Sequence, residues 1–361
     1  MLYKWRRIDA DSRRVLWKYY GFFCGLIMCG SCFGAVTWAA WNRVLFYFYV
    51  ANKQYPGSIT RAQQVMLYAF AYPWRAVFVV TYSIEFLCLS IAKLTVLDRM
   101  LAFMACQQTG SPFWRKCIAG WKFVTRLVVA GNIVGLLGNI AAASYYDMVA
   151  QSFRAASASY TANTTAGDVS GYNSYHALAD DQTRFAHSVA SIQSICEVTV
   201  LLLIVVSFLA AGIACIVRVK SNLAIAKQLK IRPDSQSSIS GKSLMQQLTC
   251  TTVFVFVAFL LRSVFSTVYA FAHLLNDYEK TTVLCPGTQW RCDSKCNNVF
   301  SHMVQWMNFT PQFQLTVVLI SSPMALLVSL WGMTSSSMLK IMRSTSTSQR
   351  ELIPVPQKSL L

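Results

Sequence analysis

Charged side chains are scarce in this sequence. Asp, Glu, Lys and Arg make up 13% of its 361 residues, whereas soluble domains carry about 25%. Acidic residues are the scarcer sign, since 14 Asp and Glu stand against 32 Lys and Arg. Hydrophobic residues reach 55%, and the mean hydropathy is +0.42. This composition excludes an ordinary soluble domain and indicates a chain embedded in lipid.

The patterns that mark common enzymes are also missing. The sequence has no H-E-x-x-H zinc motif, no G-x-S-x-G nucleophile elbow and no Gly-rich phosphate loop. The basic residues lie in short clusters beside apolar segments rather than along one polar domain. That distribution is typical of membrane topology signals and not of a nucleic-acid surface. We therefore expect no enzyme activity, cofactor, metal or nucleic-acid partner.

Long apolar stretches recur along the chain and predict an all-α, polytopic transmembrane bundle. Each stretch has about the 20 residues that a helix needs to cross the hydrocarbon core. A seventh span hidden in residues 41–72 is the alternative to six. The six expected spans cover roughly residues 19–41, 73–97, 123–145, 195–217, 250–274 and 313–331.

The connections between these spans alternate in basic charge. They carry six, two, five, two, six, three and four Lys or Arg residues, counted over residues 1–18, 51–72, 98–126, 143–191, 217–245, 276–312 and 333–361. Because cytosolic connections hold the excess of positive charge, both termini are expected in the cytosol. The predicted organisation is a cytosolic interfacial leader (1–18), spans one to three (19–145) with a basic connector (98–122), an outer loop (146–191), spans four and five (192–274) with a second basic connector (218–245), a Cys-containing outer loop (275–312), span six (313–333) and a Ser/Thr-rich cytosolic tail (334–361).

The two longer outer loops carry signals of the secretory pathway. Asn163-Thr164-Thr165 is a glycosylation sequon in the middle of loop 146–191. Helical arms are expected to lead out of span three and into span four, with a Gly/Ser/Asn-rich tip between them. Cys285, Cys292 and Cys296 crowd the second outer loop. One disulfide among these three is expected there, and their spacing matches no common zinc pattern.

Three polar residues lie near the centres of apolar stretches. Glu85 is in the second expected span, Asn132 in the third and Arg262 in the fifth. A charged residue at the centre of a membrane helix costs about 2.5–3.5 kcal/mol on insertion scales, so pairing inside the bundle is favoured. We predict that the three residues line one midplane polar site. A buried pair that only fixes helix register is the alternative.

Pro323 interrupts the sixth expected span. A proline removes one backbone hydrogen bond, and the hydroxyls of Ser321 and Ser322 can satisfy the freed carbonyl groups. These three residues are predicted to form a kink or hinge.

The end of the second expected span resembles a receptor motif. Residues 86–103, FLCLSIAKLTVLDRMLAF, resemble the cytosolic end of the third helix of rhodopsin-type G-protein-coupled receptors, where Asp-Arg-Tyr precedes a Leu-Ala pair. The resemblance implies a cytosolic coupling role for Asp98 and Arg99. Met100 replaces the aromatic residue, and the last span lacks Asn-Pro-x-x-Tyr, so no membership is assigned.

Three functions fit this sequence. A receptor-like or signalling membrane protein is favoured by the outer loops, the basic connectors as docking sites for a cytosolic signalling partner, and the phosphorylatable tail STSTS (344–348). A small-solute transporter or channel is the first alternative, although no internal repeat is visible and the fourth span shows no polar centre. A structural scaffold is the second. The expected location is the plasma membrane or a secretory-pathway membrane, and a homo-oligomer is possible.

Overall fold

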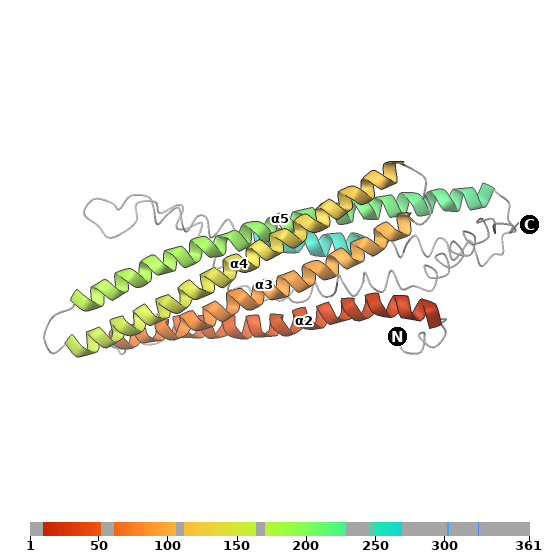
Figure 1. Cartoon of the computed structure of the whole chain (residues 1–361). Coiled ribbons are helices and arrows are strands. Elements are labelled where there is room, and N and C mark those ends of the chain that lie inside the picture. The colour runs from red at the N-terminus through yellow and green to blue at the C-terminus, as the bar shows by residue number, and fades with distance from the viewer. Residues whose placement is uncertain are drawn as a thin grey trace, which may run out of the picture. The chain divides into compact units, whose positions relative to one another are not determined.

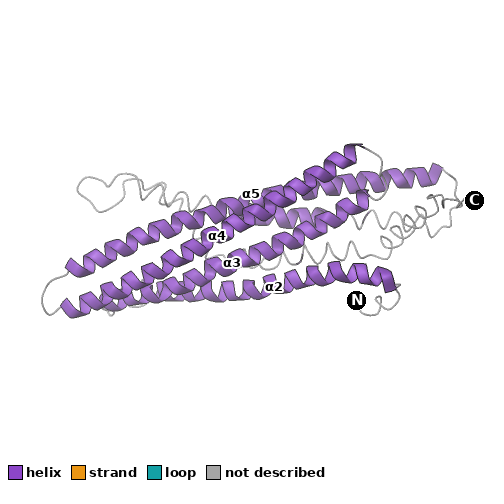
Figure 2. Ribbon diagram, viewed as in Figure 1, coloured by secondary structure: helices purple, strands orange, loops and turns teal. Residues whose placement is uncertain are grey.

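Every element in the described part of the chain is a helix (Figure 2). The computed structural model describes residues 10–51, 61–105, 112–163, 170–228 and 252–268, with isolated positions at 246, 249–250, 302 and 324. Four long helices carry labels in Figure 1. They are α2 (Ala10–Tyr49, 40 residues), α3 (Arg61–Ala105, 45 residues), α4 (Pro112–Asn163, 52 residues) and α5 (Ser170–Gln228, 59 residues).

All four helices are long and apolar enough to cross a membrane. This confirms the helical class and indicates an integral membrane protein. The fifth expected span corresponds in part to a shorter apolar helix, Thr252–Val268. The sixth span, 313–331, lies outside the described residues apart from Met324. Six spans and cytosolic termini therefore stay predictions.

The helices extend well beyond the stretches assigned to the membrane. At 1.5 Å per residue, α5 is about 88 Å long, against a hydrocarbon core of about 30 Å. The expected connection over residues 51–72 is wrong in its second half, because α3 begins at Arg61 and Pro73 lies inside it. Val65, Ala69 and Tyr72 are buried at the spacing of one helix face, and this packing overrides the polar character of the segment. Likewise, α4 begins at Pro112, inside the expected connector, where proline suits the first helical turn.

The chain divides into two compact units, and several helices contribute to both. The first unit comprises residues 1–92, 127–200 and 263–315, and the second comprises 93–126, 201–262 and 316–361. In the first unit, α4 continues to Asn163 and α5 starts at Ser170, so most of residues 146–191 is helical, as the expected helical arms predicted. We call residues 142–190 of α4 and α5 the hairpin.

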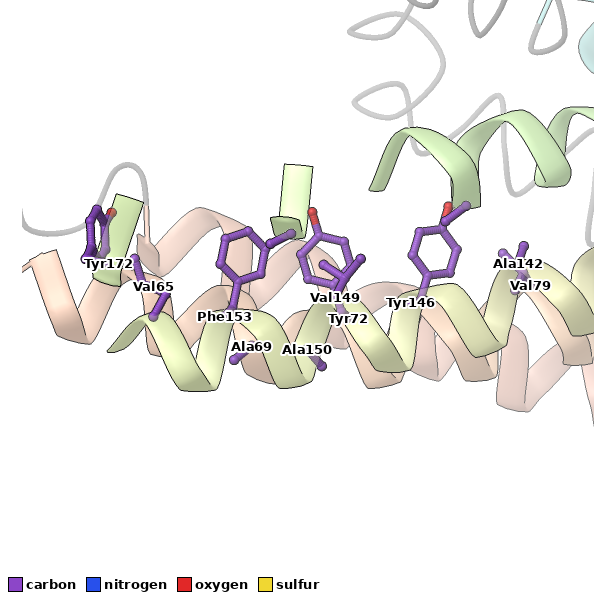
Figure 3. Packing of buried hydrophobic residues seen from close by; sticks show 13 residues of the cluster. Val65, Ala69, Tyr72, Val79, Ala142, Tyr146, Val149, Ala150, Phe153 and Tyr172 are labelled. Atoms are coloured by element: carbon purple, nitrogen blue, oxygen red, sulfur yellow. The ribbon is translucent and has the colours of Figure 1, made fainter. Parts of the chain in front are cut away.

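The hairpin packs against α3 through a core of aromatic rings and alanines. Tyr72 of α3 stacks on Tyr146 and Phe153 of α4, with ring centroids 6.0 and 5.6 Å apart (Figure 3). On α5, Tyr172, Ala179 and Ala186 are buried at intervals of seven residues. A seven-residue repeat of buried positions is the spacing of coiled-coil packing. The small alanines leave room for the large rings, and the hairpin and α3 share this core.

Glycines set the contact between α4 and α5 in the apolar region. A Cβ atom built on Gly131 would lie 3.0 Å from Val200, and one on Gly135 would collide with Gln193. A Cβ atom built on Gly138 would lie 3.4 Å from the carbonyl oxygen of Val189 and 3.6 Å from the Cβ atom of Ile192. Small residues at this spacing allow helix backbones in lipid to approach closely. The glycine-rich side of α4 is therefore the face that packs on α5.

Candidate functional site

A buried carboxylate on α5 connects three helices of the first unit. The side chain of Glu197 is 4% exposed. The hydroxyl of Tyr82 on α3 lies 2.8 Å from both carboxylate oxygens, and the hydroxyl of Ser266 donates to Oε1 at 2.7 Å. Glu197 thus joins α3, α5 and the 252–268 helix at one point.

Glu85 follows Tyr82 by three residues on α3 and lies against α2. A Cβ atom built on Gly34 of α2 would be 3.1–3.3 Å from the atoms of the Glu85 carboxylate. A side chain at position 34 would be tight against the carboxylate, and with glycine there the α2 backbone approaches Glu85 closely. One turn away, the hydroxyls of Thr37 and Thr81 are hydrogen-bonded at 2.9 Å. The contact between α2 and α3 is therefore polar at the depth of Glu85.

Two asparagines of α4 have different surroundings. Asn139 donates to the carbonyl of Val79 at 2.9 Å and to the hydroxyl of Ser83 at 2.7 Å, both on α3. Asn132 instead donates to the carbonyl of Val128 in its own helix at 2.7 Å. Its buried Oδ1 atom has no hydrogen-bond partner among the residues that the structure describes. Asn139 is therefore the asparagine that fixes α4 to α3.

The second unit contains two buried cations. Arg262 is 2% exposed and Lys93 is 1% exposed. The Lys93 ammonium lies 4.6 Å from the centre of the Phe259 ring, which stacks edge-on against Phe208 of α5. A cation over an aromatic face is stabilised by the ring quadrupole, and more strongly where water is excluded.

The predicted midplane residues are all buried, but they belong to different units. Glu85 and Asn132 lie in the first unit and Arg262 lies in the second. Their grouping into one site stays a prediction. Together with Glu197 and Lys93, the membrane helices thus bury at least two carboxylates and two cations. Ionisable groups at such positions are expensive and mark functional sites more often than packing alone.

The other predicted residues lie at helix ends or outside the described residues. Asp98 is exposed near the end of α3, and the side chain of its neighbour Arg99 is not described. Asn163 is the last residue of α4. Six of the predicted residues lie outside the described residues, so their roles stay predictions. They are Cys285, Cys292, Cys296, Ser321, Ser322 and Pro323.

The described residues form no metal centre and no disulfide. Seven of the cysteines in the described ranges are free thiols, and no three His, Cys, Asp or Glu side chains among the described residues come together as metal ligands. Comparison with models of known families, with curated proteins and with solved structures found no match to this chain. Function is therefore inferred from the side chains themselves.

Glu197 is the residue that the sequence reasoning missed. It stands two positions after Ile195, where the fourth span was expected to begin, and that span was expected to have no polar centre. The correct signal was present, because ICEVTVLLL places one acid inside an apolar run. Since α5 continues far beyond Ile195 in both directions, Glu197 lies within the bundle and not at its surface.

Proposed function

We propose that this protein is a receptor-like signalling protein of the membrane, in which the hairpin is the sensing element. The observation that carries this proposal is the continuity of α4 and α5. Neither helix is interrupted between the hairpin and the far end of its apolar stretch. A displacement of the hairpin can therefore reach the opposite side of the membrane through rigid helices.

Interhelical contacts support such transmission. Ser152 of α4 donates to Gln182 of α5 at 2.9 Å inside the hairpin, and Ser157 donates to the carbonyl of Ala62 on α3 at 3.0 Å. Deeper in the same unit, Asn139 and Glu197 tie α4 and α5 to α3. The three helices are thus joined along their length, and they respond as a group.

In this proposal, a cytosolic signalling partner binds the basic connector 218–245 and Asp98, which lies near the end of α3. A signalling partner that binds there would read the positions of the ends of α3 and α5. Deletion of residues 225–242 is expected to abolish recruitment of this partner while the protein still reaches the membrane. Normal recruitment by a correctly located deletion variant would contradict this assignment.

Transmission can be measured without knowing the ligand. Spin labels attached to a non-natural ketone amino acid at positions 98 and 220, both exposed, avoid the native thiols. Phe153→Ala removes a buried ring from the hairpin core, and Gln151→Ala is the exposed control on the same turn. We expect the distance distribution between the labels to shift or broaden in Phe153→Ala and to stay unchanged in Gln151→Ala.

Hydrogen exchange measures independently whether Phe153→Ala has loosened the hairpin. If exchange shows that Phe153→Ala has loosened residues 146–186 while the distribution between positions 98 and 220 is unaltered, the hairpin does not communicate with the far end. The receptor proposal is then wrong.

Transport is the second candidate, because Glu197 supplies the polar group that the fourth span was thought to lack. Transporter sites are commonly built where helices are broken, and α3, α4 and α5 are unbroken through their apolar stretches. Transport predicts flux in proteoliposomes that Glu197→Gln or Glu85→Gln removes and the exposed control Asp181→Asn preserves. A scaffold is favoured if neither flux nor transmission is found.

A further inference from the structure

An exposed apolar strip runs along the hairpin. On α5, Tyr175 is 42% exposed, Leu178 47% and Phe185 61%, and Met148 of α4 is 45% exposed. Tyr145 of α4 stacks on Phe185, with ring centroids 6.1 Å apart. We call these five residues the hairpin strip. They lie among charged and polar neighbours, where single apolar side chains are common but a contiguous strip indicates an interaction surface.

The bilayer is too thin to cover the outer end of this strip. The exposed apolar residues of α5 continue from Tyr175 to Val217, which is followed by the basic residues Arg218 and Lys220. At 1.5 Å per residue this distance is about 63 Å, whereas the hydrocarbon core is about 30 Å thick and the whole bilayer about 40–45 Å. If the basic end of α5 marks one membrane face, Leu178 and Tyr175 lie beyond the other.

We propose that a second copy of this chain covers the hairpin strip, giving a twofold dimer through α4 and α5. Two copies in one membrane share the same orientation and the same height. A twofold axis along the membrane normal then brings each strip against the identical strip of its partner. The proposal goes beyond the receptor function and does not depend on it.

The charges beside the strip suit a symmetric contact. Asp181 and Arg184 border Phe185 on α5, lie 3.9 Å apart and are 69% and 62% exposed. Because they differ in height by one helical turn or less, Asp181 of one copy can approach Arg184 of the other. A patch that carries both signs can pair opposite charges across a twofold axis.

Photocrosslinking in membranes tests this contact on the full-length protein. A benzophenone amino acid replaces Phe185 or Leu178, and Leu202, an exposed residue on the apolar stretch of α5, is the matched control position. Irradiation is expected to give covalent dimers from positions 185 and 178, with at least tenfold fewer from position 202. Mass analysis assigns each adduct. A link to lipid, or a link within one chain to residues 269–312, overturns the proposal.

A charge substitution gives an independent test. Phe185→Glu places two carboxylates at the contact and should lower the dimer association constant at least tenfold, as counted by single-molecule photobleaching in supported bilayers. Asn173→Glu is the control, because Asn173 is exposed and lies on another side of α5 from Leu178. Equal dimer fractions in both variants, or a wild type that stays monomeric at the same surface density, contradict the second copy as partner.

Discussion

Single buried groups hold the membrane part of this protein together, and Glu197 is the clearest case. We predict that Glu197→Leu destabilises the fold by about 2–3 kcal/mol, since it leaves the hydroxyls of Tyr82 and Ser266 without their acceptor. Glu197→Gln should cost less, because an amide oxygen can still accept one hydroxyl. Thermal unfolding in nanodiscs measures both.

The same contact can be isolated by a double-mutant cycle. Tyr82→Phe removes only the hydroxyl, so it should lower the melting temperature in the wild type and have little further effect in Glu197→Leu. If Tyr82→Phe is equally destabilising in both backgrounds, its hydroxyl and Glu197 are not coupled and the proposed junction is incorrect.

Glycines that look alike in the sequence differ in their surroundings. A Cβ atom on Gly135 collides with Gln193, whereas one on Gly25 of α2 meets nothing within 4 Å. Gly135→Leu should therefore destabilise the protein by about 1–3 kcal/mol through overpacking. Gly25→Leu, the identical substitution, should be neutral or slightly stabilising, because leucine favours a helix more than glycine does.

Melting temperatures of the two variants decide this prediction. Similar melting temperatures would mean that α4 does not approach α5 as closely as the structure indicates. The comparison is internal, since both variants add the same apolar volume to a membrane helix.

How far the sequence predicts these groups depends on where each lies in its apolar run. Glu85, Asn132 and Arg262 interrupt the middle of long runs, so their burial was predictable. Glu197 and Asn139 stand nearer the ends of the expected spans, where polar residues also occur at the headgroups. The folded structure brings Tyr82 to Glu197 and Ser83 to Asn139. Only these hydrogen bonds show that Glu197 and Asn139 are buried contacts between helices and not residues at the membrane interface.

At the scale of elements, the hairpin core determines whether the extensions of α3, α4 and α5 are stable. Phe153 is buried, and its ring packs 5.6 Å from that of Tyr72 and 5.5 Å from that of His176. Phe153→Ala should cost about 3–5 kcal/mol, as ring deletions in protein cores do. Hydrogen exchange should then accelerate over residues 146–186 and remain slow in the apolar stretches of α4 and α5.

The exposed Gln151→Ala substitution should leave exchange unchanged. Acceleration that spreads equally into residues 200–215 of α5 would show that the hairpin and the membrane part unfold as one unit. The hairpin would then have no separate stability.

The sequence predicts the helices better than their ends. Apolar runs identified α2 to α5 because a membrane requires about 20 apolar residues whatever the fold. The segment 61–72 belongs to the expected connection 51–72, but it is part of α3. Its buried face is formed by Val65, Ala69 and Tyr72 against the hairpin, a contact between residues far apart in sequence. Such contacts cannot be read from local composition.

At the scale of the whole molecule, the long helices run from the hairpin core into the apolar stretches, and these two regions bury different kinds of side chain. The hairpin core is made of tyrosines, alanines and hydrogen bonds, whereas the apolar stretches bury a few charges among aliphatic residues. The receptor-like proposal requires that α5 pass from one environment to the other as a single helix. That continuity is the central claim, and it determines how Glu197, the hairpin and the basic connector are related.

A nitroxide accessibility scan along α5, from residue 170 to residue 217, tests this claim most directly. We predict a 3.6-residue oscillation without a break. Exposed positions such as Ser174 and Asp181 should collide with a water-soluble nickel chelate, and exposed positions such as Leu202 and Ile213 with lipid-dissolved oxygen. Loss of the oscillation between residues 185 and 200, or oxygen-dominated collisions as far as Ser174, would contradict a single helix that links an outer hairpin to a membrane span.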